Sequence, residues 1–365
     1  MMLPSPSRYV LGIESSCDET SVAVLGGDGR VLSSVISSQI AAHRRYGGVV
    51  PEIAARAHLQ NLPVLLDEAL SAAGVGMGDV GAVAATAGPG LVGALLVGLS
   101  EGKGIALGLG VPFVPVHHIE GHCLSPFLRL DGGPSRPIPD AFTALVVSGG
   151  HTHLYRFTGT GIDLAARTRD DAAGEAYDKV AKMTGLGYPG GPVIDRIAAA
   201  VKIADPFPVP QFKDGSLDFS FSGLKTAVRE RLSALGVSPA TGVPGDRPAL
   251  AEADVSLRLR ELLADFQEAV VRQLEDRLTR LLARERIPLL TVSGGVAANS
   301  LLRERLAIWG RRNGLEVLLP ERALTSDNAA MIAFAGLRRA GREPVEGEMD
   351  APARSRWPLE SLRPC

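Results

Sequence analysis

The chain has 365 residues, of which 45% are hydrophobic and 21% are charged, as is typical of a soluble globular protein. This length predicts roughly two or three domains, with cores large enough to fold without cross-links. Three widely spaced cysteines, Cys17, Cys123 and Cys365, exclude a disulfide framework and favour a reducing, cytoplasmic location. The formal net charge of −2 excludes a globally basic nucleic-acid-binding protein, so such a partner would need a local patch or another subunit.

Membrane association is not expected from the sequence. Residues 1–7 lack the apolar stretch of a signal peptide. The most apolar run, residues 80–116, is interrupted by several glycines, by Pro89 and by the charged residues of 101–103, so it is interpreted as protein core.

The first hundred residues predict a strand-rich start followed by α/β segments. Strands are expected at 9–14, 20–25 and 30–38. The turn 15–19 carries hydroxyl and acidic side chains that could contact a phosphate and its metal, although a plain β-turn is the simpler interpretation. A helix is expected over 51–73, kinked or split by Pro63. A buried strand at 80–86, a glycine turn and a helix from 91 to about 109 follow, and the free N–H groups of that helix could hold an anion.

A pair of histidines follows the short strand predicted at 111–116. His118 and His122 stand four residues apart, so on a helix they share one face and can bind one divalent ion. The spacing alone fits two ordinary histidines equally well. Glu120 would lie about 200° around the helix from His118 and face away from the metal, whereas zinc proteases need their glutamate beside the first histidine. The protease motif is therefore excluded.

The second half repeats the strand–turn–strand pattern of the first. Strands at 142–147 and 153–157 flank a turn containing Gly149 and Gly150, which predicts a duplicated α/β fold. A second strand–Gly-Gly–helix unit spans 289–313, and Asn299 at its helix entrance could hydrogen-bond a base or a ribose. Five further helices are expected. One ends at about 185, one begins at 193, one runs through 235, one spans 255–286 and one begins at about 327. The stretch 237–254 is interpreted as a mobile loop or insertion.

Several aspartates have an ordinary structural interpretation beside a functional one. Asp170 and Asp171 are interpreted as the N-cap pair of the helix that follows them, and Asp327 alone is interpreted as a cap. Asp178, one turn further into its helix, is less easily explained in this way.

Taken together, these stretches resemble the universal tRNA threonylcarbamoyladenosine transferase family, whose bacterial members are called TsaD. The resemblance spans about residues 9 to 359. It rests on GIESSCDET (12–20), TAGPGL (86–91), HHIEGH (117–122), VSGGHT (147–152), DDAAGEAYDK (170–179), YPGGP (188–192), FSFSGLKT (219–226) and SGGVAAN (293–299), with RWPL (356–359) closest to bacterial members. Each motif alone is weak, but eight in the same order are specific.

The resemblance implies two actin-like α/β domains (the sugar kinase, Hsp70 and RNase H-like class) with a ligand cleft between them. We assign residues 8–140 to the first domain, with a return of the chain from 325–345, residues 141–324 to the second, and 345–365 to a tail. The resemblance further implies that His118, His122 and Asp327 bind one divalent metal per subunit, with Fe²⁺ preferred and Zn²⁺ as the alternative.

The resemblance also implies the reaction: transfer of the threonylcarbamoyl group of threonylcarbamoyl-AMP to N6 of adenosine 37, in tRNAs that read codons beginning with A. No catalytic residue is assigned beyond the metal site. Asp178 and Asn299 are expected to hold the adenylate, one from each domain. The full set of expected substrate-binding residues is Val146, Val147, Ser148, Gly149, Gly150, Asp178, Gly191, Asp195 and Asn299.

The implied partners are a paralogous actin-like subunit, a small ATPase subunit and a separate enzyme that makes the adenylate. Helix 51–73 is a candidate partner face. The rival hypothesis is a small-molecule kinase or ATPase on the same fold, since fold does not fix function. The family pattern is shorter around 237–254, so this stretch could alter partner contacts.

Overall fold

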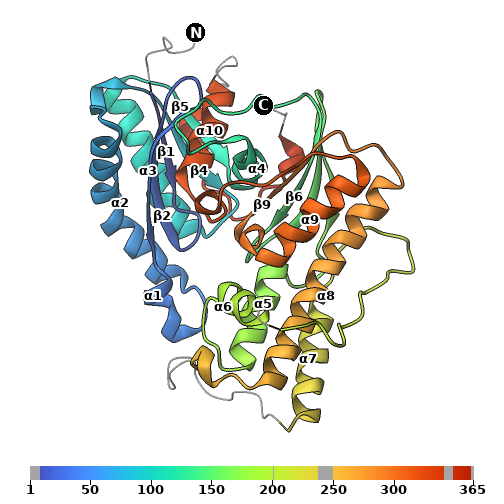
Figure 1. Cartoon of the computed structure of the whole chain (residues 1–365). Helices are drawn as coiled ribbons and strands as arrows, with labels where there is room; N and C mark the ends of the chain where they lie inside the picture. The colour runs from blue at the N-terminus through green and yellow to red at the C-terminus, as the bar shows by residue number, and fades with distance from the viewer. Residues whose placement is uncertain (1–8, 200, 237–249, 341–347, 363–365) are drawn as a thin grey trace.

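Two five-stranded sheets organise this computed structural model, which describes residues 9–199, 201–236, 250–340 and 348–362 (Figure 1). The first sheet has the order β3-β2-β1-β4-β5 and the second the order β10-β9-β6-β7-β8. The strands of the first are β1 (Tyr9–Glu14), β2 (Glu19–Leu25), β3 (Val31–Ser38), β4 (Val80–Gly88) and β5 (Phe113–His117). Those of the second are β6 (Phe142–Val147), β7 (Thr152–Phe157), β8 (Ile162–Arg167), β9 (Leu290–Ser293) and β10 (Val317–Leu318).

The two sheets share one topology. In the first, β1 pairs antiparallel with β2 and parallel with β4, while β3 and β5 extend the sheet at its two edges. In the second, β6 pairs antiparallel with β7 and parallel with β9, while β8 and β10 extend it in the same way. The duplicated α/β fold predicted from the recurring strand–turn–strand pattern is therefore confirmed.

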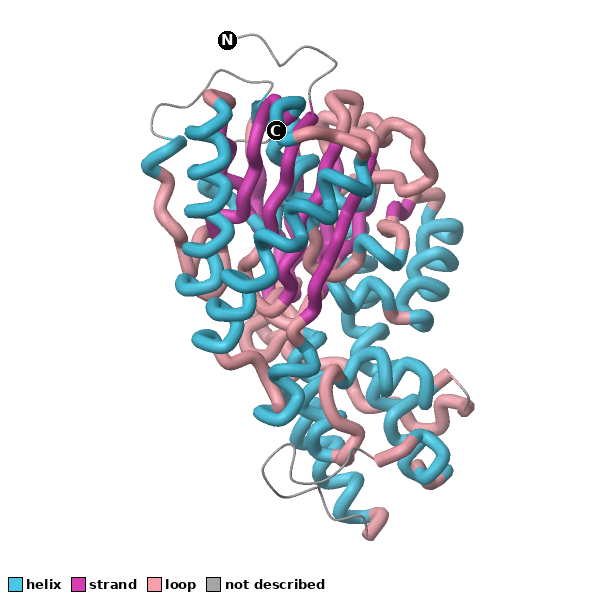
Figure 2. Tube along the Cα trace, turned by 90° about the vertical axis from the view of Figure 1, so that its left-hand side faces the viewer, coloured by secondary structure: helices cyan, strands magenta, loops and turns pink. Residues whose placement is uncertain are grey.

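Helices cover both faces of the first sheet at β1 and β4, so these strands are buried on both sides. Along β1, Leu11 and Ile13 pack toward α2 and α3, whereas Val10 and Gly12 pack toward α10. Figure 2 shows the helices on the near face in front of the strands. The helices are α1 (Ile40–His43), α2 (Pro51–Ala73), α3 (Val92–Leu109), α4 (His118–Leu124), α5 (Ala173–Met183), α6 (Gly190–Ala198), α7 (Ser222–Ala234), α8 (Leu257–Leu282), α9 (Ser300–Asn313) and α10 (Ala329–Ala340).

The helix α10 returns from the end of the chain to lie directly on β1. A Cβ atom on Gly12 would come within 2.4 Å of the carbonyl oxygen of Ala329, so glycine is needed for this approach. The contact fixes the first turn of α10 and, with it, the position of Asp327 just before that turn.

The short helix α4 lies between the two sheets, and all seven of its residues are buried. It contacts β5, β6, β9 and α10. One apolar cluster runs through this region from Val10 and Val116 of the first sheet to Phe142 and Val146 of the second. The two domains therefore share a core around α4.

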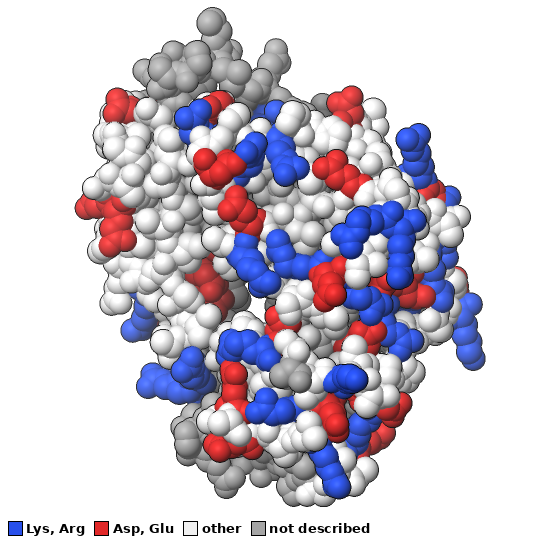
Figure 3. Space-filling model, in the orientation of Figure 1, with Lys and Arg blue, Asp and Glu red and all other residues white. Residues whose placement is uncertain are grey.

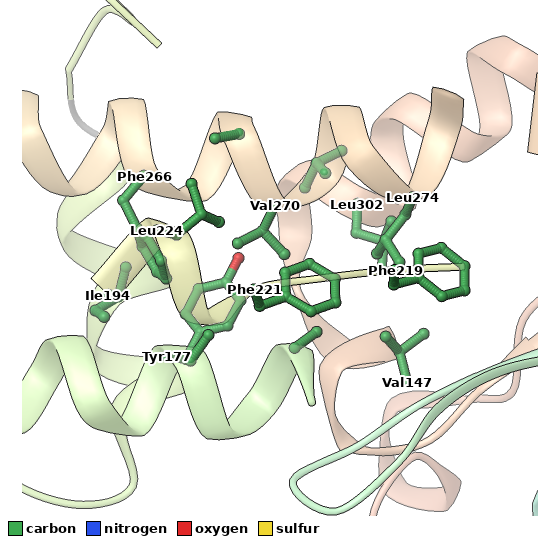
Figure 4. Close-up of a cluster of buried hydrophobic side chains, with 14 of the residues drawn as sticks. Val147, Tyr177, Ile194, Phe219, Phe221, Leu224, Phe266, Val270, Leu274 and Leu302 are labelled. Atoms are coloured by element: carbon green, nitrogen blue, oxygen red, sulfur yellow. The ribbon is translucent and has the colours of Figure 1, made fainter. Parts of the chain in front are cut away.

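The second domain has a separate core between its sheet and helices α5 to α9. Aliphatic and aromatic side chains fill it, with Tyr177, Phe221 and Phe266 pointing into it from different segments and Val147 at the edge nearest the sheet (Figure 4). Tyr177 and Phe266 meet edge to face, with ring centroids 5.2 Å apart.

The structure corrects two sequence interpretations. Helix α2 is continuous through Pro63 rather than split. Pro63 and Leu59, one turn earlier, are both exposed, so water can hydrogen-bond to the Leu59 carbonyl group that proline leaves without an N–H donor. Asp170 and Asp171 do not cap α5, whose N-cap is Ala172. The expected loop at 237–254 falls largely outside the described residues.

One helix among the described residues, α3, meets the length and apolarity that a membrane span would need. In the structure it packs against β4 and α2, with Leu95 and Leu99 in the core.

A first prediction concerns the ion pair that joins α4 to α10. Arg339 donates two hydrogen bonds to the fully buried carboxylate of Glu120, at 2.7 and 2.6 Å. Because hydrogen bonds to buried charges are worth about 1.5–3 kcal/mol, Arg339→Ala should lower the free energy of unfolding by about that amount in urea titrations. The neighbouring exposed Arg338 is the matched control, and Arg338→Ala should change stability by less than about 0.5 kcal/mol. Equal effects of the two substitutions would contradict this prediction.

Candidate metal centre and ligand cleft

The helix α4 is capped by the residue that precedes it. His117, at the end of β5, caps the helix: its Nδ1 accepts a hydrogen bond from the N–H of Ile119 at 3.1 Å. Its Nε2 donates to the carbonyl oxygen of Trp357 in the C-terminal tail at 2.8 Å. Burial lowers the pKa of His117 to about 3, so the ring is neutral and this single tautomer satisfies both contacts.

His118 is oriented by a carboxylate from the first strand. Its Nδ1 lies 3.0 Å from Oε2 of Glu14, which is fully buried at the end of β1, and 3.2 Å from Oγ of Ser16. Thr86 donates to the same Glu14 oxygen at 2.7 Å. With Nδ1–H donating to Glu14, Nε2 of His118 is the atom left to bind a metal, as in the carboxylate–histidine–metal arrangement of many metal sites.

His122 and Asp327 complete the cluster. Nε2 of His122 lies 3.0 Å and Nε2 of His118 lies 3.6 Å from Oδ1 of Asp327. One ligand atom from each of the three residues lies within 4.8 Å of the others. The structure thus brings His118, His122 and Asp327 together across 205 residues of sequence, and Asn328 rather than Asp327 accepts the capping N–H of Met331.

The electrostatics of the cluster fit a cation. Burial lowers the pKa of His118, but the carboxylates of Glu14 and Asp327 outweigh burial and raise it to about 9. Burial raises the pKa of Asp327, but His118 and His122 outweigh it and hold it well below its usual range. In the protein alone, the protonated His118 lies between the buried carboxylate of Glu14 and the partly exposed carboxylate of Asp327, and a divalent cation would supply that positive charge. Nδ1 of His122 is also buried without a hydrogen-bond partner among the described residues.

Glu120 takes no part in this cluster. Its carboxylate is held by Arg339 on the other side of α4. The exclusion of the zinc-protease motif therefore has a structural reason, because Glu120 cannot reach a water beside the histidine pair.

Glycine turns beside the cluster form the candidate ligand cleft. Val146 and Val147 end β6, and the turn Ser148–Gly150 follows, with Gly191 in the first turn of α6. A Cβ atom on Gly149, Gly150 or Gly191 would meet nothing within 4 Å, so these three backbones border open space. In contrast, a Cβ atom on Gly294 would come within 2.4 Å of the carbonyl oxygen of Val147, so Gly294 serves packing rather than ligand approach.

The candidate ligand-binding aspartates already serve as helix caps. Asp178 of α5 accepts the N–H of Gly190 at 2.7 Å, at the start of α6. Asp195 of α6 accepts the N–H and the hydroxyl of Ser300, at the start of α9. Each carboxylate thereby complements the positive end of a neighbouring helix. Burial raises the pKa of Asp178 to about 6, and only the Gly190 N–H opposes it, since Asp18 and Glu175 raise it further.

Asn299 is buried and its amide is engaged within the protein. Its Oδ1 accepts the N–H of Leu302 at 2.9 Å, and its Nδ2 donates to Gln267 at 2.8 Å. Asp178 and Asn299 both belong to the elements around the second sheet. The expectation that the two residues come from different domains is therefore wrong.

Sequence reasoning missed two contributors. Glu14 is expected from the sequence only as the end of a strand, although its place at the carboxyl end of β1, beside the carboxyl ends of β4 and β5, is where α/β folds assemble sites. His151 follows the Gly149–Gly150 turn and lies within electrostatic reach of His118, His122 and Asp327; burial lowers its pKa to about 3. The signal for His151 was its position next to a glycine pair at a strand end.

Comparisons with known proteins agree with this geometry. Residues 30–334 match the TsaD family model, described as tRNA N6-adenosine threonylcarbamoyltransferase. The protein of that name from Geobacter sp. (strain M21) is 46% identical over 358 residues, covering 97% of both chains. The one from Aromatoleum aromaticum is 48% identical over 356 residues, covering 97% of this chain and 98% of the relative.

A solved structure supports the fold. Component A of the (R)-2-hydroxyglutaryl-CoA dehydratase of Acidaminococcus fermentans superposes with a TM-score of 0.51 at 14% identity, covering 92% of this chain and all of that one. At this identity the likeness concerns the fold alone. The expected fold, two actin-like α/β domains, is confirmed.

The role of Glu14 gives a second prediction. Glu14→Gln keeps the shape of the side chain but weakens its hold on Nδ1–H of His118, and loss of such a partner typically lowers metal affinity about 10–100-fold. The affinity for Zn²⁺ and Fe²⁺ is measured by competition with a chelator. Glu19→Gln removes a carboxylate from the same hairpin that hydrogen-bonds Ser38 instead, and it should leave the affinity within about threefold of wild type. A Glu14→Gln protein that holds metal as tightly as the control would refute the assigned role.

Proposed function

The chain belongs to the TsaD family of tRNA N6-adenosine threonylcarbamoyltransferases, and from this premise we propose its reaction in detail. It transfers the threonylcarbamoyl group of threonylcarbamoyl-AMP to N6 of adenosine 37, in tRNAs that read codons beginning with A. A bond forms between N6 and the carbamoyl carbon, the bond from that carbon to the phosphate oxygen breaks, N6 loses a proton, and AMP leaves. The observation that carries the proposal is the His118–His122–Asp327 cluster, which lies within electrostatic reach of His151 beside the Gly149–Gly150 turn.

The metal centre in this proposal is one divalent ion per subunit bound by His118, His122 and Asp327. Two imidazoles and one carboxylate suit Fe²⁺ and Zn²⁺, and we propose Fe²⁺ as the native ion with Zn²⁺ as the alternative. Three protein ligands leave further positions open, as catalytic rather than structural sites do. A bound ion would supply Lewis acidity to the carbonyl group of the donor. Glu14 and Ser16 keep the His118 ring in the orientation that leaves Nε2 available.

The adenylate in this proposal lies in the cleft beside the metal. The exposed backbones at Gly149, Gly150 and Gly191 let a ligand approach closely, with Val146, Val147 and Ser148 forming the floor of the turn. Asp178 offers its second carboxylate oxygen to a ribose hydroxyl. Asp195 and Asn299 shape the same wall of the cleft through the start of α9.

The partners in this proposal are the tRNA, a paralogous actin-like subunit and a small ATPase, with the adenylate made by a separate enzyme in the cytoplasm. Neighbouring helices α2 and α3 expose large apolar side chains, Leu59 and Val64 on α2 and Leu96 and Leu107 on α3, which suit helical packing with the paralogue. In Figure 3 most Lys and Arg side chains of the visible face lie over the second domain, interleaved with acidic ones. With 38 basic and 40 acidic residues, tRNA binding is best shared among subunits.

The small-molecule kinase or ATPase is not favoured. The relatives matched over nearly the whole chain are named as transferases. In a sugar kinase, the histidine pair and the Glu14 carboxylate that orients His118 would also have no role in the reaction.

A single-turnover assay tests the function. Purified threonylcarbamoyl-AMP, metal and an unmodified tRNA that reads a codon beginning with A are mixed with the chain, alone and with its partner subunits, and tRNA nucleosides are analysed by mass spectrometry. We expect threonylcarbamoyladenosine to form at physiological salt only with the partners, and not with His118→Ala/His122→Ala in their presence. Fast modification by the chain alone would contradict the shared-binding argument, and no modification in any mixture would contradict the function.

Asp178 gives a prediction with a pH dependence. Because burial raises its pKa to about 6, Asp178 becomes protonated as the pH falls through 6 and accepts ribose hydroxyls less well. Affinity for a stable threonylcarbamoyl-AMP analogue should therefore fall below pH 6 in the wild-type protein. Asp178→Asn should bind about ten- to a hundred-fold more weakly at pH 7.5, as loss of a charge-assisted hydrogen bond implies, with a flatter pH profile. Calorimetric titration between pH 5 and 8 measures both, and identical profiles for the two proteins would exclude Asp178 as a ligand.

A further inference from the structure

A pocket of about 350 Å³ opens on the second domain between α5 and α7, apart from the metal cluster. This volume lies within the range of ligand sites. Its walls carry three cations, one anion and two hydroxyls, from Asp171, Lys179, Ser222, Gly223, Lys225, Thr226 and Arg229.

One face of α7 supplies most of the pocket. Ser222, Lys225, Thr226 and Arg229 stand at positions i, i+3, i+4 and i+7, so they lie along one side of the helix. The buried residues Leu224, Val228 and Leu232 occupy the other side and hold α7 in the core. The exposed face is therefore built of cations and hydroxyls on a rigid support.

Two of the three cations have no partner among the described residues. Lys179 lies between two carboxylates, Asp171 at 2.6 Å and Glu175 at 2.9 Å. Lys225 and Arg229 make no side-chain hydrogen bond or ion pair with any residue in the described part of the chain. In this part of the chain the pocket thus keeps two positive charges without a counter-ion, beside a lysine that two carboxylates already neutralise.

The first turn of α7 is already fixed, so the pocket does not depend on a bare helix end. Asp170 accepts hydrogen bonds from the N–H groups of Phe221 and Ser222 and from the hydroxyls of Ser220 and Ser222. Next to it, Gly223 leaves the mouth open, because a Cβ atom there would meet nothing within 4 Å.

The pocket is next to the ligand cleft. Lys179 directly follows Asp178 on α5, and Asp178 holds the N-terminus of α6 with Gly191 in its first turn. A polymer whose reacting base enters the cleft can therefore extend its backbone toward this pocket. Lys, Arg and hydroxyl side chains are the groups that bind nucleic-acid phosphates.

We propose that the α5–α7 pocket binds a backbone phosphate of the RNA substrate, with Lys225 and Arg229 supplying the charge and Thr226 a hydrogen bond. This inference rests on the proposed function for the identity of the polymer. Its role is to hold the RNA strand near the reacting base, so these are positioning residues rather than catalytic ones.

The experiment measures how tRNA binding depends on salt. Binding of an unmodified tRNA transcript to the full chain, with its partner subunits, is followed at several salt concentrations for wild type and Lys225→Gln/Arg229→Gln. Each phosphate that a protein neutralises contributes ~0.7 to ~0.9 to the slope of log affinity against log salt, so loss of this one phosphate contact in the double variant should lower the slope by that amount. In the transfer assay its KM for tRNA should rise while kcat at saturating tRNA is kept.

A second pocket variant and a control variant test the same interpretation. Gly223→Asp places a carboxylate in the open mouth of the pocket, at a helix start where acidic residues are favourable, so it should weaken tRNA binding without lowering stability. Arg286→Glu is the control for net charge: Arg286 is exposed and precedes β9, so it lies at the end of the sheet opposite the cleft. It should leave the salt slope unchanged.

Titration with inorganic phosphate distinguishes the two sources of the anion. A reduced salt slope in the double variant supports the proposal whether or not free phosphate binds. Free phosphate binding with an unchanged tRNA slope would overturn it and assign the pocket to a small anion, and an unchanged slope without phosphate binding would overturn it entirely. Failure of the proposed function is separate, because it would appear as absent transfer by the wild-type complex.

Discussion

The complete burial of α4 is the constraint on which the rest of the structure depends. A seven-residue helix with three imidazole or carboxylate side chains lies between two sheets, where each polar group must find a partner. His117 is satisfied by the tail, His118 by Glu14 and Glu120 by Arg339, which come from three distant parts of the sequence. Only Nε2 of His118 and the His122 ring are left to act together with Asp327. The candidate metal centre is thus formed by the groups around α4 that the fold leaves without another partner.

The acidic side chains proposed for the ligand cleft also stabilise the starts of helices. Asp178 holds the start of α6 and Asp195 the start of α9. Loss of activity in a variant at either position therefore has two causes that must be separated, misplacement of a helix and loss of a ligand contact. Stability and binding have to be measured on the same protein before a role is assigned.

The local order of residues along the chain was enough to predict the hairpins, the duplication and the shared helix face of the two histidines. Alternating strands and glycine turns predicted the hairpins at 9–25 and 142–157, and their recurrence predicted the duplication. The spacing of His118 and His122 placed both on one helix face. What the sequence could not show was contact between distant elements: Asp170 caps α7 rather than its own helix, and Glu14 reaches His118 across 104 residues. The capping rule looks only at neighbours along the chain, whereas in a folded protein an aspartate binds whichever N–H groups packing brings near it.

The return of α10 to the first sheet has a consequence for how the protein is made. Ribosomal synthesis releases β1 to β5 and both histidines long before Asp327 and α10, so one face of the first sheet stays uncovered until α10 has been made. Apolar residues such as Val10 and Val116 are exposed during that interval, a period in which chaperones and proteases compete for the nascent chain. A product that ends before α10 keeps that bare face and lacks the third residue of the His118–His122–Asp327 cluster. Quality control can therefore recognise it by its surface.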